Sequence, residues 1–226
     1  MRTSRMKLTR TVRGLVMPCL AIVVTACGTQ TQDIKAHRDW KQALSSGTTS
    51  VVFGRIQWLE HGEPRQIGTG LFDFSVSPNL LRIEDKWKTH AEADRNGTFV
   101  WALEPGIYVI NRINYRDPWS GNYFMVPKVA FRVPDKGQIY YVGTLSADFA
   151  SKRDLIGGLS GQVTVAIKDQ LQEDEQAISK PLGALPKNVQ KSLMVHDEDL
   201  PGTLDTTKEF NMAVRVLNAI FFGLSH

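Results

Sequence analysis

Cysteine is almost absent from this chain. Only Cys19 and Cys27 occur among its 226 residues, and both lie close to the N-terminus. A fold held together by several disulfides is therefore excluded, as are zinc sites built from pairs of cysteines. No internal repeat of about 20–50 residues is present, which excludes solenoids and propellers. The fold must depend on the burial of apolar side chains.

Long apolar runs are also lacking. The longest, from Gly14 to Ala26, is shorter than the roughly 20 residues that a bilayer-spanning helix needs. No acidic residue precedes Cys27, whereas five basic residues do: Arg2, Arg5, Lys7, Arg10 and Arg13. A basic start, a short apolar run and small residues at its end are typical of a secretory signal. We therefore expect residues 1–26 to be a signal peptide.

The end of that run has two interpretations. Val24-Thr25-Ala26-Cys27 resembles the lipobox of bacterial lipoproteins, whose cysteine is acylated and becomes the first residue. In that family the residue after the cysteine influences sorting, and Gly28 at this position resembles the lipoproteins that are directed to the outer membrane. Ordinary cleavage is the alternative, but it would leave a lone thiol in an oxidising compartment. We favour lipid attachment at Cys27, on an outer-membrane protein that faces the periplasm.

The chain has little excess charge of either sign once this leader is set aside. The net charge of +4 includes the five leading basic residues, so the rest has 22 basic against 23 acidic residues. Nucleic-acid binding needs a clustered basic face and is not expected. The expected partners are the membrane, through the lipid, and an envelope protein or glycan.

Residues 49–169 have the pattern of a β-sheet protein. Val163, Val165 and Ile167 alternate with polar residues, as in half-buried strands. Similar runs cover residues 50–58, 72–76, 81–84, 98–103, 107–115, 125–133 and 138–145. About eight short strands with turns between them predict a mainly β fold, an antiparallel β-sandwich. Pro127 places its strand at a sheet edge or a bulge.

Helices are expected on both sides of this domain. Residues 27–48 are predicted to be a tether with a short helix from Asp33 to Ala43. Residues 170–226 are predicted to be a helical extension with helices at 171–180, at 186–194 and from Phe210 onward. The last has apolar residues at helical spacing, and we expect this stripe to pack on the sandwich.

Three stretches resemble known families. "NGTFVWALEPGIYVINRI", residues 96–113, resembles the strand–Pro-Gly–strand unit of prealbumin-like and carboxypeptidase-regulatory-like sandwiches, in which Leu103 and Tyr108 would pack in the core. "GQIYYVGTL", residues 137–145, and "LGALPKNVQKSLM", residues 182–194, are similar to bacterial lipoprotein domains of unknown function of the DUF2846 kind. The resemblance implies a β-sandwich on a lipid anchor and implies no catalytic residues.

One loop is a candidate binding site. Tyr115, Asp117, Trp119 and Tyr123 crowd the turn at residues 118–121, with Arg116 and Asn122 among them. Aromatic side chains with polar neighbours on a rigid scaffold can hold a sugar or a protein partner. The alternative is that Trp119 folds back and caps the core.

Two His-x-Glu pairs are weak candidates for a metal site. His61 with Glu63, and His90 with Glu92, would each place an imidazole and a carboxylate on one face of a strand. Solvated loop residues are the simpler interpretation, and no cofactor is expected. The sequence therefore favours a lipid-anchored, non-catalytic binding or scaffolding module of the cell envelope. The alternatives are a hydrolase of envelope polymers and a metal-binding periplasmic protein.

Overall fold

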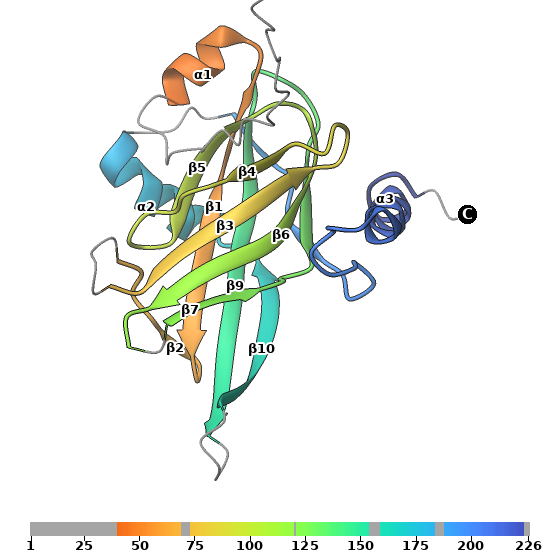
Figure 1. Cartoon of the computed structure of the whole chain (residues 1–226). Coiled ribbons are helices and arrows are strands. Elements are labelled where there is room, and N and C mark those ends of the chain that lie inside the picture. The colour runs from red at the N-terminus through yellow and green to blue at the C-terminus, as the bar shows by residue number, and fades with distance from the viewer. Residues whose placement is uncertain (1–39, 69–72, 120, 154–158, 184–187, 224–226) are drawn as a thin grey trace, which may run out of the picture. The chain divides into compact units, whose positions relative to one another are not determined.

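The computed structural model describes residues 40–68, 73–119, 121–153, 159–183 and 188–223. Within these residues, twelve strands form two sheets and three helices accompany them (Figure 1). The predicted mainly β sandwich is confirmed. The predicted signal peptide, Cys27 and most of the tether lie outside the described residues.

One sheet, called sheet one below, has two long strands at its centre. These strands, β1 (Ser50–Glu60) and β9 (Ile139–Arg153), are parallel, a pairing that the sequence did not predict. Shorter strands pair along their outer edges: β5 (Thr98–Leu103), β2 (Glu63–Pro64), β10 (Leu159–Lys168) and β11 (Val189–Lys191). Close approach of the central strands requires glycine, since a Cβ on Gly54 would lie 2.4 Å from the carbonyl oxygen of Gly143.

The other sheet, called sheet two, is antiparallel in all its described pairings. Its strands are β12 (Val195–His196), β8 (Val129–Val133), β6 (Gly106–Asp117), β3 (Ser75–Arg82) and β4 (Lys88–His90), with β7 (Gly121–Met125) also on β6. The β3–β6 register shifts because Leu80 pairs with Ile110 whereas Asn79 pairs with Arg112, so that Asn111 has no counterpart on β3. A bulge of this kind bends the strand and changes the direction of nearby side chains.

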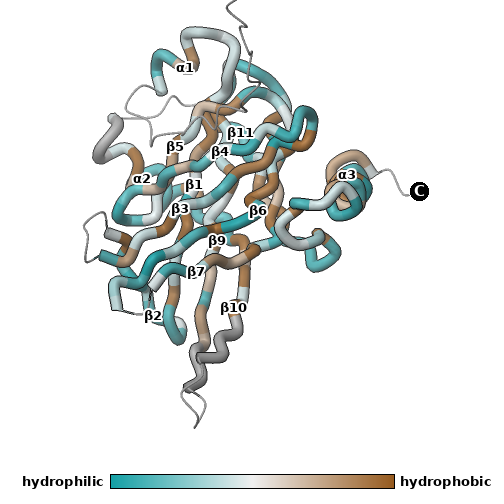
Figure 2. The backbone as a smooth tube through the Cα atoms, in the orientation of Figure 1, coloured by the Kyte–Doolittle hydropathy of each residue, from teal (hydrophilic) through white to brown (hydrophobic). Residues whose placement is uncertain are grey.

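The core between the sheets is rich in aromatic rings. Phe99, Trp101, Tyr108, Phe131 and Tyr140 are fully buried there. Leu103 and Tyr108, which flank the Pro105-Gly106 turn, both belong to this core, as the family resemblance implied. In Figure 2, hydrophobic and hydrophilic residues alternate along several strands, which is the pattern of strands with one buried face.

Two helices cover the outer face of sheet one. α1 (Trp40–Ser46) and α2 (Leu171–Leu182) contribute Trp40 and Ile178 to an apolar cluster on that face. The strands contribute Phe53 and Tyr141 to the same cluster. The short helix of the predicted tether therefore packs on sheet one from Trp40 onward.

The third helix, α3 (Thr207–Phe222), lies on the outer face of sheet two. Its fully buried Ala213 and Leu217 pack in one cluster with side chains of that sheet. Thr206 and Glu209 form a capping box at its start, and Gly223, with φ +64, ends it in the left-handed region. None of the described helices is long and apolar enough to cross a membrane.

Three local predictions were wrong. Residues 189–191, expected within a helix, form β11, because β10 pairs with β9 only from Thr144 onward and leaves the start of β9 open. Pro127 separates β7 from β8 and does not lie inside one strand. The two strands expected at 72–76 and 81–84 are replaced by the single strand β3.

Candidate functional site

Exposed large apolar side chains gather on one hairpin. Trp119, Tyr123 and Phe124 lie on the β6–β7 hairpin, whereas Met212 and Phe222 lie on α3. Trp119 is 90% exposed, so the alternative in which it caps the core is wrong. Apolar groups gathered at a surface are typical of interaction sites. The β6–β7 hairpin is therefore a candidate interaction site.

Two tyrosines of the predicted loop connect this hairpin to the core. Tyr115 of β6 lies opposite Tyr123 of β7, with ring centroids 5.4 Å apart. Tyr115 also contacts Trp58, at 4.8 Å, and Phe149, at 5.5 Å, both on sheet one. Burial raises the pKa of Tyr115 above its ordinary value.

Asp117, the third predicted residue, is bound by an arginine. Its carboxylate accepts a hydrogen bond from Arg65, which also donates to Glu60 at 3.2 Å. The Arg65 guanidinium lies 4.3 Å from the ring centroid of Phe74, a cation–π distance. The structure thus brings all four predicted residues onto one hairpin, with Trp119 the most exposed of them.

A hollow crosses the outer face of sheet two between β3, β6 and β7. Its volume is about 320 Å³, and we call it the outer groove. The cross-strand register places its side chains in two rows, Ser77–Asn114–Phe124 and Ser75–Arg116–Asn122. Tyr115 and Tyr123 complete the lining.

The side chains of the outer groove are suited to binding a polar ligand. The serine hydroxyls and asparagine amides both donate and accept hydrogen bonds, whereas Arg116 only donates. Phe124 is 56% exposed and adds an apolar surface. Its ring centroid lies 5.3 Å from the guanidinium of Arg112. No histidine, aspartate or glutamate is among the described residues that line this groove.

Sequence reasoning missed four residues of the outer groove: Ser75, Ser77, Asn114 and Phe124. The signal for Asn114 is the alternation along β6, since Ile113 and Tyr115 pack in the core and their neighbours must face outward. The alternation of Phe74 and Val76 likewise places Ser75 on the outer face, but only the pairing of β3 with β6 brings the serines to the groove.

A larger hollow, of about 520 Å³, adjoins Trp119 on another side. Gly68 and Asp73 line it, and they flank residues 69–72, which the structure does not describe. No site is therefore assigned there.

The weak metal candidates are not brought together. His61 and Glu63 lie in the turn after β1 and in β2, at the edge of sheet one. His90 belongs to β4 in sheet two, where its ring is hydrogen-bonded to Asn79. Glu92 follows β4. Among the residues that the structure describes, no three His, Cys, Asp or Glu side chains gather as a metal site would require.

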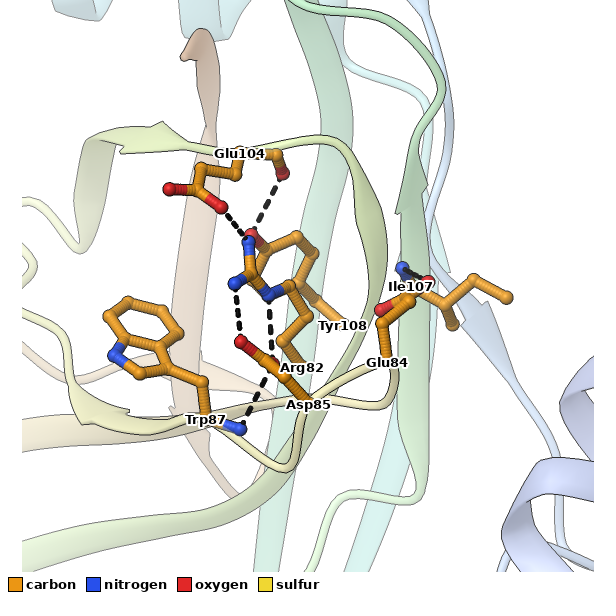
Figure 3. Close-up of polar contacts among 7 residues, drawn as sticks. All are labelled: Arg82, Glu84, Asp85, Trp87, Glu104, Ile107 and Tyr108. Atoms are coloured by element: carbon orange, nitrogen blue, oxygen red, sulfur yellow. Dashed lines mark hydrogen bonds and ion pairs between the residues drawn. The ribbon is translucent and has the colours of Figure 1, made fainter. Parts of the chain in front are cut away.

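The charged cluster in Figure 3 is a structural clasp between two turns. Arg82, at the end of β3, donates to the carboxylates of Asp85 and Glu104. Glu84 accepts from the backbone N–H of Ile107 at 2.9 Å, and the Tyr108 hydroxyl donates to the Glu104 carbonyl at 2.8 Å. The hydrogen bond from Arg82 lowers the pKa of Asp85. We call this cluster the Arg82 clasp.

A buried carboxylate attaches α2 to sheet one. Asp174 accepts hydrogen bonds from the hydroxyls of Tyr141, at 2.8 Å, and Thr144, at 2.6 Å. Arg55 lies 3.7 Å from its other oxygen. Burial, followed by the bond to Asp174, raises the pKa of Tyr141. Buried charges are tolerated only with such partners, so we assign this group to the packing of α2.

Comparison with known proteins identifies no family. No protein-family model and no curated protein matches the chain. Among solved structures it is similar to a DUF3823 family protein from Parabacteroides merdae ATCC 43184, with 17% identity and a TM-score of 0.26. That match covers 54% of this chain and 60% of the other, so the chain spans about three fifths of that protein's length.

Two further solved structures are dioxygenases. The chain is similar to 3-chlorocatechol 1,2-dioxygenase from Rhodococcus opacus 1CP, with 9% identity, a TM-score of 0.21, and coverage of 73% of this chain and 64% of the other. It is also similar to a single-residue variant of catechol 1,2-dioxygenase from Acinetobacter radioresistens, with 7% identity, a TM-score of 0.23 and coverage of 76% and 59%. Similarities this low support no conclusion about activity.

Proposed function

We propose that this chain is a lipid-anchored, non-catalytic binding module of the bacterial cell envelope, and that its outer groove binds a glycan. One observation carries the proposal. Two rows of hydroxyl, amide and guanidinium groups lie beside the exposed ring of Phe124 on the outer face of sheet two.

The chemistry of the groove favours a glycan over a protein partner. A sugar ring has an apolar C–H face, which suits Phe124, and a rim of hydroxyls, which suits groups that both donate and accept. The serine, asparagine and arginine side chains that line the groove supply the hydrogen-bonding partners that such a rim of hydroxyls needs. A protein partner would instead be expected to cover Trp119 at the tip of the hairpin.

The proposed anchor rests on the sequence alone. Val24-Thr25-Ala26-Cys27 has the form of a lipobox, and the resemblance to lipoprotein domains of the DUF2846 kind agrees with it. Acyl chains contribute about 0.8 kcal/mol for each buried CH₂, so several chains on Cys27 would hold the protein at the membrane. Mass spectrometry of the purified protein tests this, since an unmodified Cys27 would contradict the anchor.

A hydrolase is the alternative function. Glycoside hydrolysis commonly needs two carboxylates at about 5–10 Å from each other on either side of the scissile bond. The described lining of the outer groove contributes none, which supports binding without cleavage. Release of reducing ends from envelope polysaccharide by the purified protein would reverse this preference.

The proposal is tested by titrating the protein with soluble envelope oligosaccharides in a calorimeter. Phe124→Ala is expected to weaken binding about tenfold, a loss of roughly 1.4 kcal/mol. Phe222→Ala is a matched control, because Phe222 is also exposed and lies 4.7 Å from an arginine, Arg132, but sits on α3. Equal affinity of the wild type and both variants would contradict the proposed site. Capture of a protein and no glycan would favour a protein partner.

A further inference from the structure

A second hollow lies beside the outer groove on the same face of sheet two. Its volume is about 210 Å³, and its walls come from β3, β4, β6 and the loop of Thr203 and Asp205. In the β3–β6 register, the pair Asn79–Arg112 of this hollow follows the pair Ser77–Asn114 of the groove. The two hollows are therefore neighbours on one face of the sheet. We call the second one the Asn111 hollow.

Asn111 gives this hollow an acceptor without a protein partner. The side chain is only 7% exposed, and its amide nitrogen donates to the Thr203 carbonyl at 3.1 Å. Its Oδ1 atom is buried and accepts no hydrogen bond from any described residue. A buried acceptor without a donor is costly, so a shift of the side chain that exposed this oxygen to a ligand hydroxyl would be favoured.

The hollow also carries two cations, Lys88 and Arg112. Lys88 is paired with Asp205 of the same lining at 3.1 Å, and hydrogen bonds from Thr203 and Lys88, followed by the charges of Lys88 and Arg112, lower the pKa of that carboxylate. None of the ion pairs recorded for the described residues involves Arg112. Its guanidinium lies between the Asn111 hollow, which it lines, and the ring of Phe124 in the groove. A guanidinium can donate two parallel hydrogen bonds to a carboxylate.

Resting on the proposed function, we infer that the Asn111 hollow selects an acidic sugar within the bound glycan. Arg112 pairs with the carboxylate of that sugar, and Asn111 Oδ1 accepts a hydrogen bond from an adjacent hydroxyl. The next sugar of the chain lies in the outer groove against Phe124.

The test compares two probes with the same sugar backbone, one with free carboxylates and one with neutral methyl esters. Wild-type protein is titrated with a short oligogalacturonate and with its fully methyl-esterified form, at low salt. We expect the acid to bind about tenfold more tightly than the ester, and we expect added salt to reduce this ratio. Inorganic phosphate, which has charge but no sugar ring, is expected to bind at least about tenfold more weakly than the acid.

Each failure has a separate meaning. Equal affinities for acid and ester would overturn the inference and leave the proposed function standing. Binding of neither probe would overturn the inference, and it would overturn the proposed function as well only if the envelope oligosaccharides also fail to bind. Phosphate binding as tight as that of the acid would overturn the assignment to a sugar.

Substitutions of Arg112 test whether this residue causes the preference for the acid. Arg112→Gln is expected to lower acid affinity more than ester affinity and so to remove the preference for the acid, and Arg112→Lys to keep part of the preference. Arg215→Gln is the matched control, since Arg215 is exposed on α3 and lines neither hollow. An equal loss of acid and ester affinity in Arg112→Gln, or loss of the acid preference in Arg215→Gln, would overturn the assignment to Arg112.

An increase in affinity for the acidic probe would distinguish a binding role of the Asn111 hollow from a purely structural one. Asp205→Asn removes the carboxylate that faces Lys88 and Arg112, so acid affinity is expected to rise about threefold relative to ester affinity. A fall in acid affinity, with the melting temperature unchanged, would contradict the inference.

Discussion

The two halves of the outer face of sheet two differ, although the same strands build both. In one half the outward side chains are apolar, among them Leu81, Ile107 and Val109, and α3 packs on them. Beyond the bulge at Asn111 the outward side chains of β3 and β6 are polar, and they line hollows. We call these the covered half and the open half.

The difference shows that the outward residues of a strand decide what can lie on it. A sheet face that exposes aliphatic side chains must bury them against another element. A face of serine, asparagine and arginine remains stable in water and leaves room for a ligand. In β3 the change occurs within two residues, from Asn79 to Leu81.

The strongest test of this comparison is a cavity in the covered half. Leu217→Ala removes a fully buried side chain of α3 and is expected to lower the free energy of unfolding by about 2–5 kcal/mol. Met212→Ala, on the exposed side of the same helix, is expected to change it by less than about 0.5 kcal/mol. Urea denaturation measures both. Similar values for the two variants would mean that α3 is not packed on the sheet.

A smaller effect is expected where α3 begins. Thr206→Ala removes the side chain that accepts the hydrogen bond from the Glu209 backbone, at a cost of about 1 kcal/mol. Thr206→Ser keeps the capping hydroxyl and is expected to match the wild type. If the alanine variant has the same urea midpoint of unfolding as the wild type, the cap at the first turn of α3 does not stabilise the packing of α3 on the covered half.

The covered half was more predictable from the sequence than the open half. Alternation along the strands indicates which residues face the core, and the spacing of Ala213 and Leu217 indicates the buried side of α3. The alternation also assigns Asn114 to the outer face, but it does not indicate whether another element covers that residue. That depends on where α3 docks, a tertiary contact between residues distant in the sequence.

Long-range pairing explains the other differences. The parallel pair β1–β9 joins Val51 to Ile139, and no local pattern specifies such a partner. The same holds for β11, whose residues favour a helix locally but pair with β9. The polar and aromatic neighbours of Tyr115 in the sequence predict a binding loop, whereas in the structure Tyr115 packs against Trp58 of sheet one.

A third prediction concerns the Arg82 clasp, next to the covered half. Because Arg82 lowers the pKa of Asp85 below its ordinary value of 3.8, the ionised carboxylate stabilises the fold above that pH. This contribution is lost as the pH falls through the lower, folded-state pKa. Asp85 is 46% exposed, so Asp85→Asn is expected to cost less than about 1 kcal/mol at pH 7.

Thermal melting of the wild type and Asp85→Asn at a series of pH values measures this. The gap between the two curves should be widest at neutral pH and close in acid. A gap that persists unchanged at the lowest pH would mean that the charge of Asp85 is not what stabilises the turn.

The smallest effect on stability is expected in the open half. Ser77→Ala and Asn114→Ala alter outward side chains of the outer groove, and each is expected to change the free energy of unfolding by less than about 0.5 kcal/mol. If the groove binds a glycan, the same two variants should weaken that binding, because each removes a hydrogen-bonding group. Variants that keep the wild-type stability but bind the glycan more weakly would show that this surface is kept open for a ligand. Variants that keep both would show a surface that only faces water. Large losses of stability would instead show that these polar residues hold sheet two together, and the contrast between the halves would then have no functional meaning.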